Sequence, residues 1–161
     1  MSDAPFRAAV LAVSTSKSAG DGVDESGPKL GALLEESGCQ LVAVELIPDD
    51  RELIAGRLRF YADQEACDLI ATTGGTGLSV DDVTPEATRD VIDREAPGIA
   101  EAMRLASREH VPKHWMLSRA VSGSRGRTLI VNFPGNPNAI EQAGAAITPS
   151  LGHALGLLRR Q

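Results

Sequence analysis

The sequence contains little cysteine, few aromatic side chains and no excess of basic residues. Cys39 and Cys67 are its only cysteines, and their spacing fits neither a disulfide framework nor a Cys-x-x-Cys metal or redox motif. Both are therefore expected in the core. Aromatic residues make up 3% of the chain, too few for a base-stacking platform. The net charge of −6 argues against a broad nucleic-acid-binding surface, so nucleic acid is not an expected partner.

Long apolar runs, repeats and linkers are also absent. No stretch reaches the roughly 18 uninterrupted apolar residues of a membrane span, and the first residues lack the basic start and apolar run of a signal peptide. A cytoplasmic, soluble protein without a membrane partner is the expectation. With no Pro/Gly/Ser-rich linker between two hydrophobic regions, residues 1–161 are predicted to form one domain.

Short β-branched or aliphatic runs alternate with longer stretches of helical spacing. This alternation predicts an α/β fold, a three-layer α/β/α sandwich with a mostly parallel central sheet. Strands are expected at 8–13, 40–47 and 68–73, and 116–121 is expected to pair with 127–133 across a turn at 122–126. Residues 14–25 are predicted to be a loop, and helices are predicted at 27–37, 50–65, 85–95, 98–109, 140–147 and 149–160.

A glycine-rich segment follows the third predicted strand. Residues 72–77 read Thr-Thr-Gly-Gly-Thr-Gly, and the glycines let backbone N–H groups turn toward one point, which suits a phosphate. The segment matches neither Gly-x-Gly-x-x-Gly nor the Walker pattern. An ordinary turn is the alternative, but ligands of open α/β sheets gather beyond the carboxyl ends of strands, where this loop is expected.

Two groups of aspartates could share that crevice. Asp81 and Asp82 follow the glycines, and carboxylates beside a phosphate site make sense if a hard cation such as Mg²⁺ lies between them. The alternative is that they satisfy the start of the next helix, where Thr84 is the expected N-cap. Asp49 ends the second strand region, and a capping interaction with Glu52 competes there with a ligand role.

Residues 132–138, Asn-Phe-Pro-Gly-Asn-Pro-Asn, end another predicted strand. Pro134 and Gly135 predict a tight turn, and Asn136 before Pro137 is typical of an N-cap followed by an N1 proline. An anion could bind at this helix start, although a purely structural turn explains the pattern as well.

Together these segments resemble the MogA/MoaB family of molybdenum-cofactor biosynthesis proteins. The resemblance rests on the glycine segment followed by Asp82-Val-Thr-Pro, supported in order by Ser26-Gly-Pro, Ile47-Pro-Asp-Asp, Leu117-Ser-Arg and Pro134-Gly. It spans residues 7–155. It implies a molybdopterin-binding α/β/α fold, a homotrimer or hexamer, and a possible downstream molybdate insertase as partner.

The resemblance also implies an activity, adenylyl transfer from ATP to the terminal phosphate of molybdopterin with release of pyrophosphate. Asp49 and Asp82 map onto the family's two important aspartates, which would hold Mg²⁺ directly or through water. The implied substrate- and nucleotide-binding residues are Ser26, Gly27, Thr73, Gly74, Gly75, Thr76, Gly77, Arg119, Pro134, Gly135 and Asn136.

The sequence departs from the family pattern near the expected pocket. Asp81 stands where many relatives have Arg, Asn136 where Ser or Gln is common, and Asn138 where Lys is common, while Lys17 offers a replacement cation. A non-catalytic molybdopterin carrier is therefore the alternative to the adenylyltransferase. The larger molybdate-inserting relatives are disfavoured because 161 residues leave no room for their additional domains.

Overall fold

A six-stranded sheet with the order β2-β1-β3-β6-β5-β4 organises the computed structural model, which describes residues 4–161. The predicted domain's first three residues lie outside that range. Strands β1 (Phe6–Val13), β2 (Cys39–Ile47), β3 (Leu69–Thr73) and β6 (Thr128–Phe133) are parallel. Strands β5 (Ser122–Arg125) and β4 (Arg94–Glu95) are antiparallel additions at one edge. The mostly parallel sheet confirms the predicted fold class.

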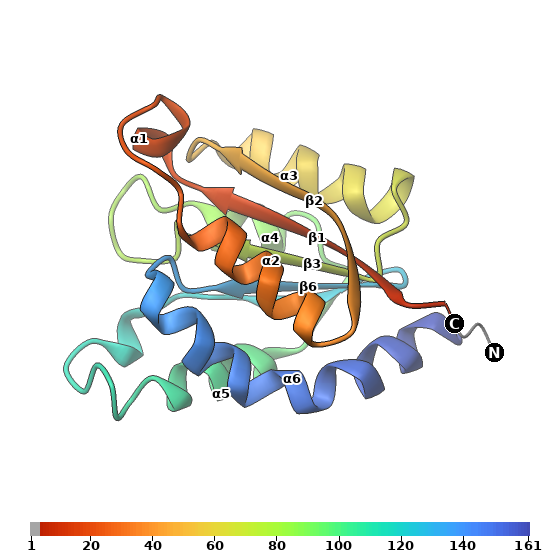
Figure 1. The fold of residues 1–161 in the computed structure, drawn as a ribbon. Coiled ribbons are helices and arrows are strands. Elements are labelled where there is room, and N and C mark those ends of the chain that lie inside the picture. The colour runs from red at the N-terminus through yellow and green to blue at the C-terminus, as the bar shows by residue number, and fades with distance from the viewer. Residues whose placement is uncertain (1–3) are drawn as a thin grey trace.

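Helices cover both faces of this sheet (Figure 1). One face carries α2 (Ser26–Glu36), α5 (Pro97–Ala106) and α6 (Pro137–Arg159). The other carries α3 (Arg51–Arg59), the π-helical turn Phe60–Gln64 and α4 (Thr84–Arg89). Two buried clusters fill the spaces between sheet and helices, and they make the predicted three layers.

The central strand β1 is buried on both of its faces. Val10 packs in the α2/α6 cluster and Leu11 in the α3/α4 cluster, because successive side chains of a strand point to opposite faces. Cys39 and Cys67 are free and buried, as predicted. Burial raises the pKa of the Cys67 thiol to about 11, so it stays protonated as a small core residue.

The strand predicted at 116–121 as the partner of 127–133 was wrong. Residues 115–117 form a single 3-10 turn, and β5 begins only at Ser122. The register pairs Arg125 with Thr128, so the tight turn lies at Gly126 and Arg127. Gly126 has φ +51°, a conformation that favours glycine, and this places the turn at the end of the predicted 122–126 segment, whose other residues belong to β5.

Several helix predictions also need correction. The 14–25 segment contains a short helix, α1 (Thr15–Ser18), capped by the Ser14 side chain. The helix predicted to end at 95 ends at Arg89, and Arg94–Glu95 instead add a strand beside β5. The two closing helices are one, because α6 runs through Pro149. No helix of residues 4–161 is long and apolar enough to cross a membrane.

Candidate functional site

The loops that follow β1, β2, β3 and β6 meet beyond the carboxyl ends of these strands (Figure 1). Thr15 after β1 contacts Asp49 after β2, and Ser26 at the start of α2 contacts Gly135 after β6. Gly135 in turn approaches Gly74 so closely that a Cβ atom on Gly135 would lie 3.1 Å from the Gly74 Cα. The fold therefore brings together segments that lie more than 100 residues apart in sequence.

The loop of residues 74–78, called the glycine loop below, has a conformation that side chains would disturb. Gly74 and Gly75 have φ +95° and +67°. A Cβ on Gly74 would collide with the Val13 carbonyl oxygen, and one on Gly75 with the Thr84 hydroxyl. Within the described chain, the backbone N–H groups of residues 75–78 donate to no acceptor. Free backbone donors next to positive φ angles are the groups from which anion-binding nests are built.

Asp49 borders this loop and is not the helix cap that its spacing to Glu52 suggested. Its Oδ2 accepts hydrogen bonds from the backbone N–H and the hydroxyl of Thr15, at 2.9 and 2.8 Å. The cap of α3 is Asp50, whose Oδ1 accepts from Leu53 N–H at 2.9 Å. Asp49 Oδ1 would lie 3.1 Å from a Cβ on Gly75, so this oxygen faces the glycine loop.

Asp82 borders the same loop at Gly77, two residues after Gly75. Its Oδ2 accepts from Ser79 N–H at 3.0 Å and would lie 2.7 Å from a Cβ on Gly77. Two residues of chain span at most about 7 Å, so Asp49 and Asp82 flank one short stretch of backbone. Asp81 is exposed and its amide contacts only the Ser79 hydroxyl.

The two aspartates fit a hard cation that takes part of its shell from a substrate. Within residues 4–161, neither carboxylate forms a salt bridge, and Oδ1 of each has no hydrogen-bond donor. No group of three or more His, Cys, Asp and Glu side chains in that range could enclose a metal by itself. Mg²⁺ characteristically uses one or two carboxylates together with waters and phosphate oxygens, which matches this arrangement.

Thr84 was predicted as the N-cap of α4 but is its first helical residue, with Val83 at the cap position. The Thr84 hydroxyl is fully buried and has no hydrogen-bond partner within the described residues, while its backbone N–H donates to the Gly75 carbonyl at 3.1 Å. The sequence pattern pointed to capping, and so missed a hydroxyl that lies against the glycine loop.

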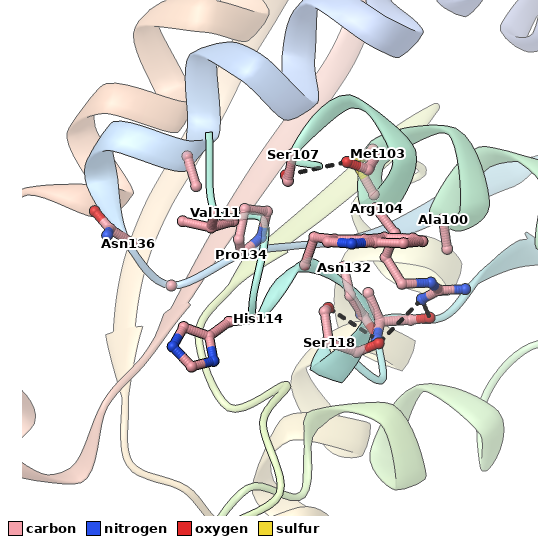
Figure 2. A pocket seen from close by; sticks show the side chains of 14 residues that line it. Ala100, Met103, Arg104, Ser107, Val111, His114, Ser118, Asn132, Pro134 and Asn136 are labelled. Carbon is pink, nitrogen blue, oxygen red and sulfur yellow. Dashed lines mark hydrogen bonds between the residues drawn. The ribbon is translucent and has the colours of Figure 1, made fainter. Parts of the chain in front are cut away.

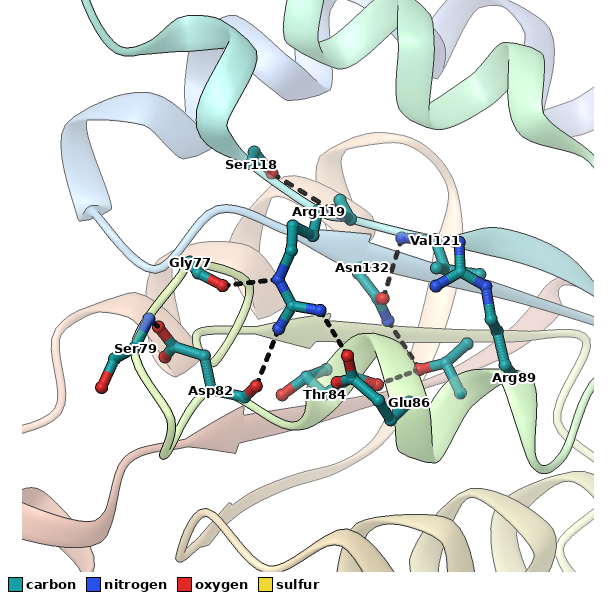
Figure 3. A network of polar contacts seen from close by, with 12 residues as sticks. Gly77, Ser79, Asp82, Thr84, Glu86, Arg89, Ser118, Arg119, Val121 and Asn132 are labelled. Carbon is teal, nitrogen blue, oxygen red and sulfur yellow. Dashed lines mark hydrogen bonds and ion pairs between the residues drawn. The ribbon is translucent and has the colours of Figure 1, made fainter.

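Arg119 contacts the glycine loop, Asp82 and Glu86 (Figure 3). Its Nε donates to the Gly77 carbonyl at 2.7 Å, its Nη2 donates to the Asp82 carbonyl at 2.8 Å, and its Nη1 pairs with Glu86. The hydrogen bond from Arg119 holds the pKa of Glu86 below its usual range. All three guanidinium nitrogens therefore have partners within the protein.

Two predicted binding residues use their hydroxyls to hold the loop of residues 134–136. Thr73 Oγ1 donates to the Pro134 carbonyl and Ser26 Oγ donates to the Gly135 carbonyl, each at 2.7 Å. The Asn136 side chain accepts from Asn138 N–H at 2.9 Å, so Asn136 is the predicted N-cap of α6 with Pro137 after it.

The start of α2 is capped from within the chain. Asp24 Oδ1 accepts from the N–H groups of Ser26 and Gly27, both at 3.1 Å. Gly27 has no room for a side chain, since a Cβ would collide with Asp24 and approach Ala12. Ser26 and Gly27 thus lie beside the site, where they shape it through their packing.

Lys17 reaches the site from α1. It lines a cavity of about 130 Å³ together with Asp24, Gly74 and Gly135. Within the described chain its ammonium group forms no salt bridge, which leaves it available to an anionic ligand. The lysine that the sequence offers as a replacement cation thus lies near Gly74 and Gly135.

A second cavity, of about 230 Å³, adjoins the 134–136 loop (Figure 2). Apolar parts of α5 and of the segment after it line most of it, including Met103, Val111 and Trp115. His114 and Asn136 add polar groups at its border. Sequence patterns did not find this cavity, because Met103 reads as an ordinary core position of an amphipathic helix. The only tryptophan of the chain, beside His114, was the available signal.

The structure thus defines an α/β protein whose glycine loop, Asp49 and Asp82 lie together at the carboxyl ends of the parallel strands. A family model described as a probable molybdopterin-binding domain matches residues 9–153, and the chain belongs to this family. This confirms the resemblance inferred from the sequence motifs.

Individual relatives support the assignment. The chain is 37% identical over 151 residues to a protein of Helicobacter pylori named molybdopterin adenylyltransferase, covering 92% of this chain and 85% of the relative. It is 40% identical over 148 residues to a protein of that name from Haemophilus influenzae, covering 91% and 75%. The solved structure of the molybdopterin biosynthesis enzyme MoaB from Thermus thermophilus superposes with a TM-score of 0.90 at 44% identity, covering 97% of this chain and 98% of that one.

Proposed function

We propose that this protein acts in molybdenum cofactor biosynthesis as a molybdopterin adenylyltransferase. An oxygen of the terminal phosphate of molybdopterin attacks the α-phosphorus of ATP, a new P–O bond forms, and the bond to the β-phosphate breaks as pyrophosphate leaves. The observation that carries the proposal is the glycine loop, with four free backbone donors between two aspartates that have no basic partner.

The reaction requires no protein nucleophile, because the pterin phosphate is itself the nucleophile. The protein contributes position and charge stabilisation, which account for most of the catalysis of phosphoryl-transfer reactions. The N–H groups of residues 75–78 would receive anionic oxygens. The Lys17 ammonium, which lines a cavity with Gly74, would neutralise part of the same charge.

Asp49 and Asp82 would hold Mg²⁺, directly or through water. When bound, the ion neutralises phosphate oxygens and favours departure of pyrophosphate. The carboxylates need such an ion nearby, because they would otherwise repel the phosphates that the glycine loop receives. Both side chains are preorganised by hydrogen bonds to one of their oxygens only.

The apolar cavity beside the 134–136 loop would take a planar ring. ATP and molybdopterin each carry a flat heterocycle, and cavities with apolar walls and a few polar groups suit such rings. A ring placed there would set its phosphates near Gly135, which lies against the glycine loop.

The proposal has three further parts. Assembly into a homotrimer or hexamer and delivery of the product to a molybdate insertase rest on the family resemblance, and a cytoplasmic location is the third. Multi-angle light scattering tests the first of these. A mass of three or six chains is expected, and a monomeric mass would refute this part.

Pyrophosphate release from Mg-ATP, with and without freshly liberated molybdopterin, tests the activity. Release that depends on the pterin is the expected result. Pterin binding without pyrophosphate release would overturn the adenylyltransferase and favour the carrier. The residues to change back to the family pattern would then be the uncharged Asn136 and Asn138 and the acidic Asp81. ATP binding without pterin binding would refute both.

A further inference from the structure

In the glycine loop and at Asp82, Arg119 contacts only backbone carbonyl groups. Its own N–H donates to the Thr76 carbonyl at 2.8 Å, its Nε to the Gly77 carbonyl and its Nη2 to the Asp82 carbonyl. One residue thereby holds three carbonyl groups along seven residues of loop. Its guanidinium is anchored in turn by Glu86 on α4 (Figure 3).

These bonds determine where the neighbouring N–H groups point. In a trans peptide the C=O and the N–H of the same unit point in opposite directions. Because the Thr76 and Gly77 carbonyls are directed at Arg119, the N–H groups of Gly77 and Leu78 point away from it. Those two groups are among the four that have no acceptor in residues 4–161.

We propose that Arg119 is a positioning residue, which holds the glycine loop so that its amides present one anion site and Asp82 stays beside it. It acts from behind the loop and does not touch the substrate. The identity of the anion, the phosphates of ATP, rests on the function proposed above. The loop conformation that Arg119 maintains does not depend on that identity.

The alternative role for a cation here is a direct contact with a phosphate. The bonding of Arg119 disfavours it, since each nitrogen of the guanidinium already donates to a carbonyl or to Glu86. Three of the five guanidinium N–H groups are thereby directed at the protein, so the loop and Glu86 set the orientation of the guanidinium.

Glu86 separates the two roles experimentally. If Arg119 positions the loop, Glu86→Gln loosens its anchor and weakens ATP binding. If Arg119 contacts substrate, the same change frees a positive charge for the phosphates, so ATP affinity stays equal or increases. Isothermal titration with Mg-ATP distinguishes these outcomes, and equal or tighter binding would overturn the proposal.

Arg125 offers a matched control. It is similarly half-buried, and it too pairs with a carboxylate (Asp63) and donates to a carbonyl (Val91). Arg125 pairs with Thr128 at the start of β6, so it lies at the other end of the parallel strands from the glycine loop. Arg119→Gln is expected to lower kcat/KM for ATP by about 100-fold, the size of effect that misplacement by about 1 Å produces. Arg119→Lys is expected to recover part of that loss, and Arg125→Gln is expected to keep the wild-type value despite a comparable decrease in Tm.

Hydrogen exchange supplies a readout that needs no substrate. The N–H of Asp82 bonds to the Ser79 carbonyl and that of Thr84 to the Gly75 carbonyl, at 3.0 and 3.1 Å. Both amides are expected to exchange faster in folded Arg119→Gln and to be unchanged in Arg125→Gln. Unchanged exchange in Arg119→Gln would refute the positioning role. An inactive wild type would refute the proposed activity instead and leave this comparison intact.

Discussion

At the residue scale, the site is built as much by missing side chains as by present ones. Gly74 and Gly75 adopt positive φ angles, and the space where their side chains would lie is occupied by Val13, Thr84 and Asp49. The backbone can therefore bring its own N–H groups to the ligand. In such a loop a single methyl group is a large change.

Gly74→Ala is expected to lower the free energy of unfolding by about 1–3 kcal/mol, because alanine is strained at this φ and its Cβ meets a backbone oxygen. Gly56→Ala is the control. Gly56 lies in α3 with open space around it, so alanine is expected to raise the unfolding free energy by about 0.5–1 kcal/mol. Urea unfolding measures both changes, and a neutral Gly74→Ala would contradict the assigned conformation.

Asp82→Asn is expected to preserve the fold, since an amide oxygen can still accept from Ser79 N–H. The loss of charge is expected to reduce AMP transfer by about 100-fold or more, as for other single groups that stabilise charge in a transition state. Asp81→Asn, one residue away and exposed, is the control and is expected to retain activity. Circular dichroism and pyrophosphate release together check both variants. Full turnover by Asp82→Asn would exclude the assigned role.

Sequence motifs predicted which residues gather at the site better than what each one does. Asp49 and Asp50 are adjacent, and only the structure shows that the second caps α3 while the first faces the loop. Arg119 reads as a cation for phosphate, but its partners are carbonyls that become neighbours only after folding. Spacing along a chain carries no information on such long-range partners.

At the scale of elements, apolar periodicity identified strands and helices, and the turns between them were less predictable. Buried runs such as 69–73 were found within a residue. The hairpin of β5 and β6 was displaced because Ala120 and Val121 read as a strand although the ladder begins at Ser122. Helix α6 was divided at Pro149 because proline normally ends a helix.

The continuity of α6 has a packing cause. Ile147 and Leu151 flank Pro149 and are both buried in the same cluster, so burial on either side outweighs the missing hydrogen bond. Pro149 itself is exposed. Pro149→Ala is therefore expected to raise the free energy of unfolding, by up to about 3 kcal/mol, without creating a cavity.

Urea unfolding of Pro149→Ala checks this prediction, with Gly152→Ala in the same helix as a reference for helix propensity alone. Gly152 has open space around its Cα and is expected to gain about 1 kcal/mol. A decrease in stability for Pro149→Ala would show that the proline is required where it stands.

The ion pair of Asp68 with Arg159 joins the start of β3 to the end of α6. Burial acts to raise the pKa of Asp68, but hydrogen bonds from Arg159 and from the Arg7 amide outweigh it and hold the pKa below its usual value. Because the folded pKa lies below the unfolded value of about 3.9, the stabilisation is present above that pH. It is lost as the pH falls through the folded pKa.

Asp68→Asn is therefore expected to be less stable than wild type at pH 7. As the pH falls below about 4, where the wild-type carboxylate titrates, the variant is expected to lose less unfolding free energy than wild type does. Thermal unfolding across that range measures it. Parallel pH profiles for the two proteins would contradict the assigned ion pair.

At the scale of the whole molecule, the proposal places polyphosphates on a chain of net charge −6. Acidic side chains would be tolerated there because Asp49 and Asp82 suit a bound cation, while Lys17 and the backbone donors would supply the remaining positive potential. The α/β/α class followed from the sequence, as did the position of the glycine loop at the carboxyl end of β3. The apolar cavity did not, because its wall comes from α5, the following segment and the 134–136 loop.

AMP is proposed to be joined to molybdopterin at this site. Mass spectrometry of the pterin after incubation with Mg-ATP and the protein tests it most directly, with Asp82→Asn in parallel. A product heavier than molybdopterin by one adenylyl group is expected with wild type, and far less of it with the variant. Unmodified molybdopterin after incubation with folded wild-type protein would refute adenylyl transfer by this protein.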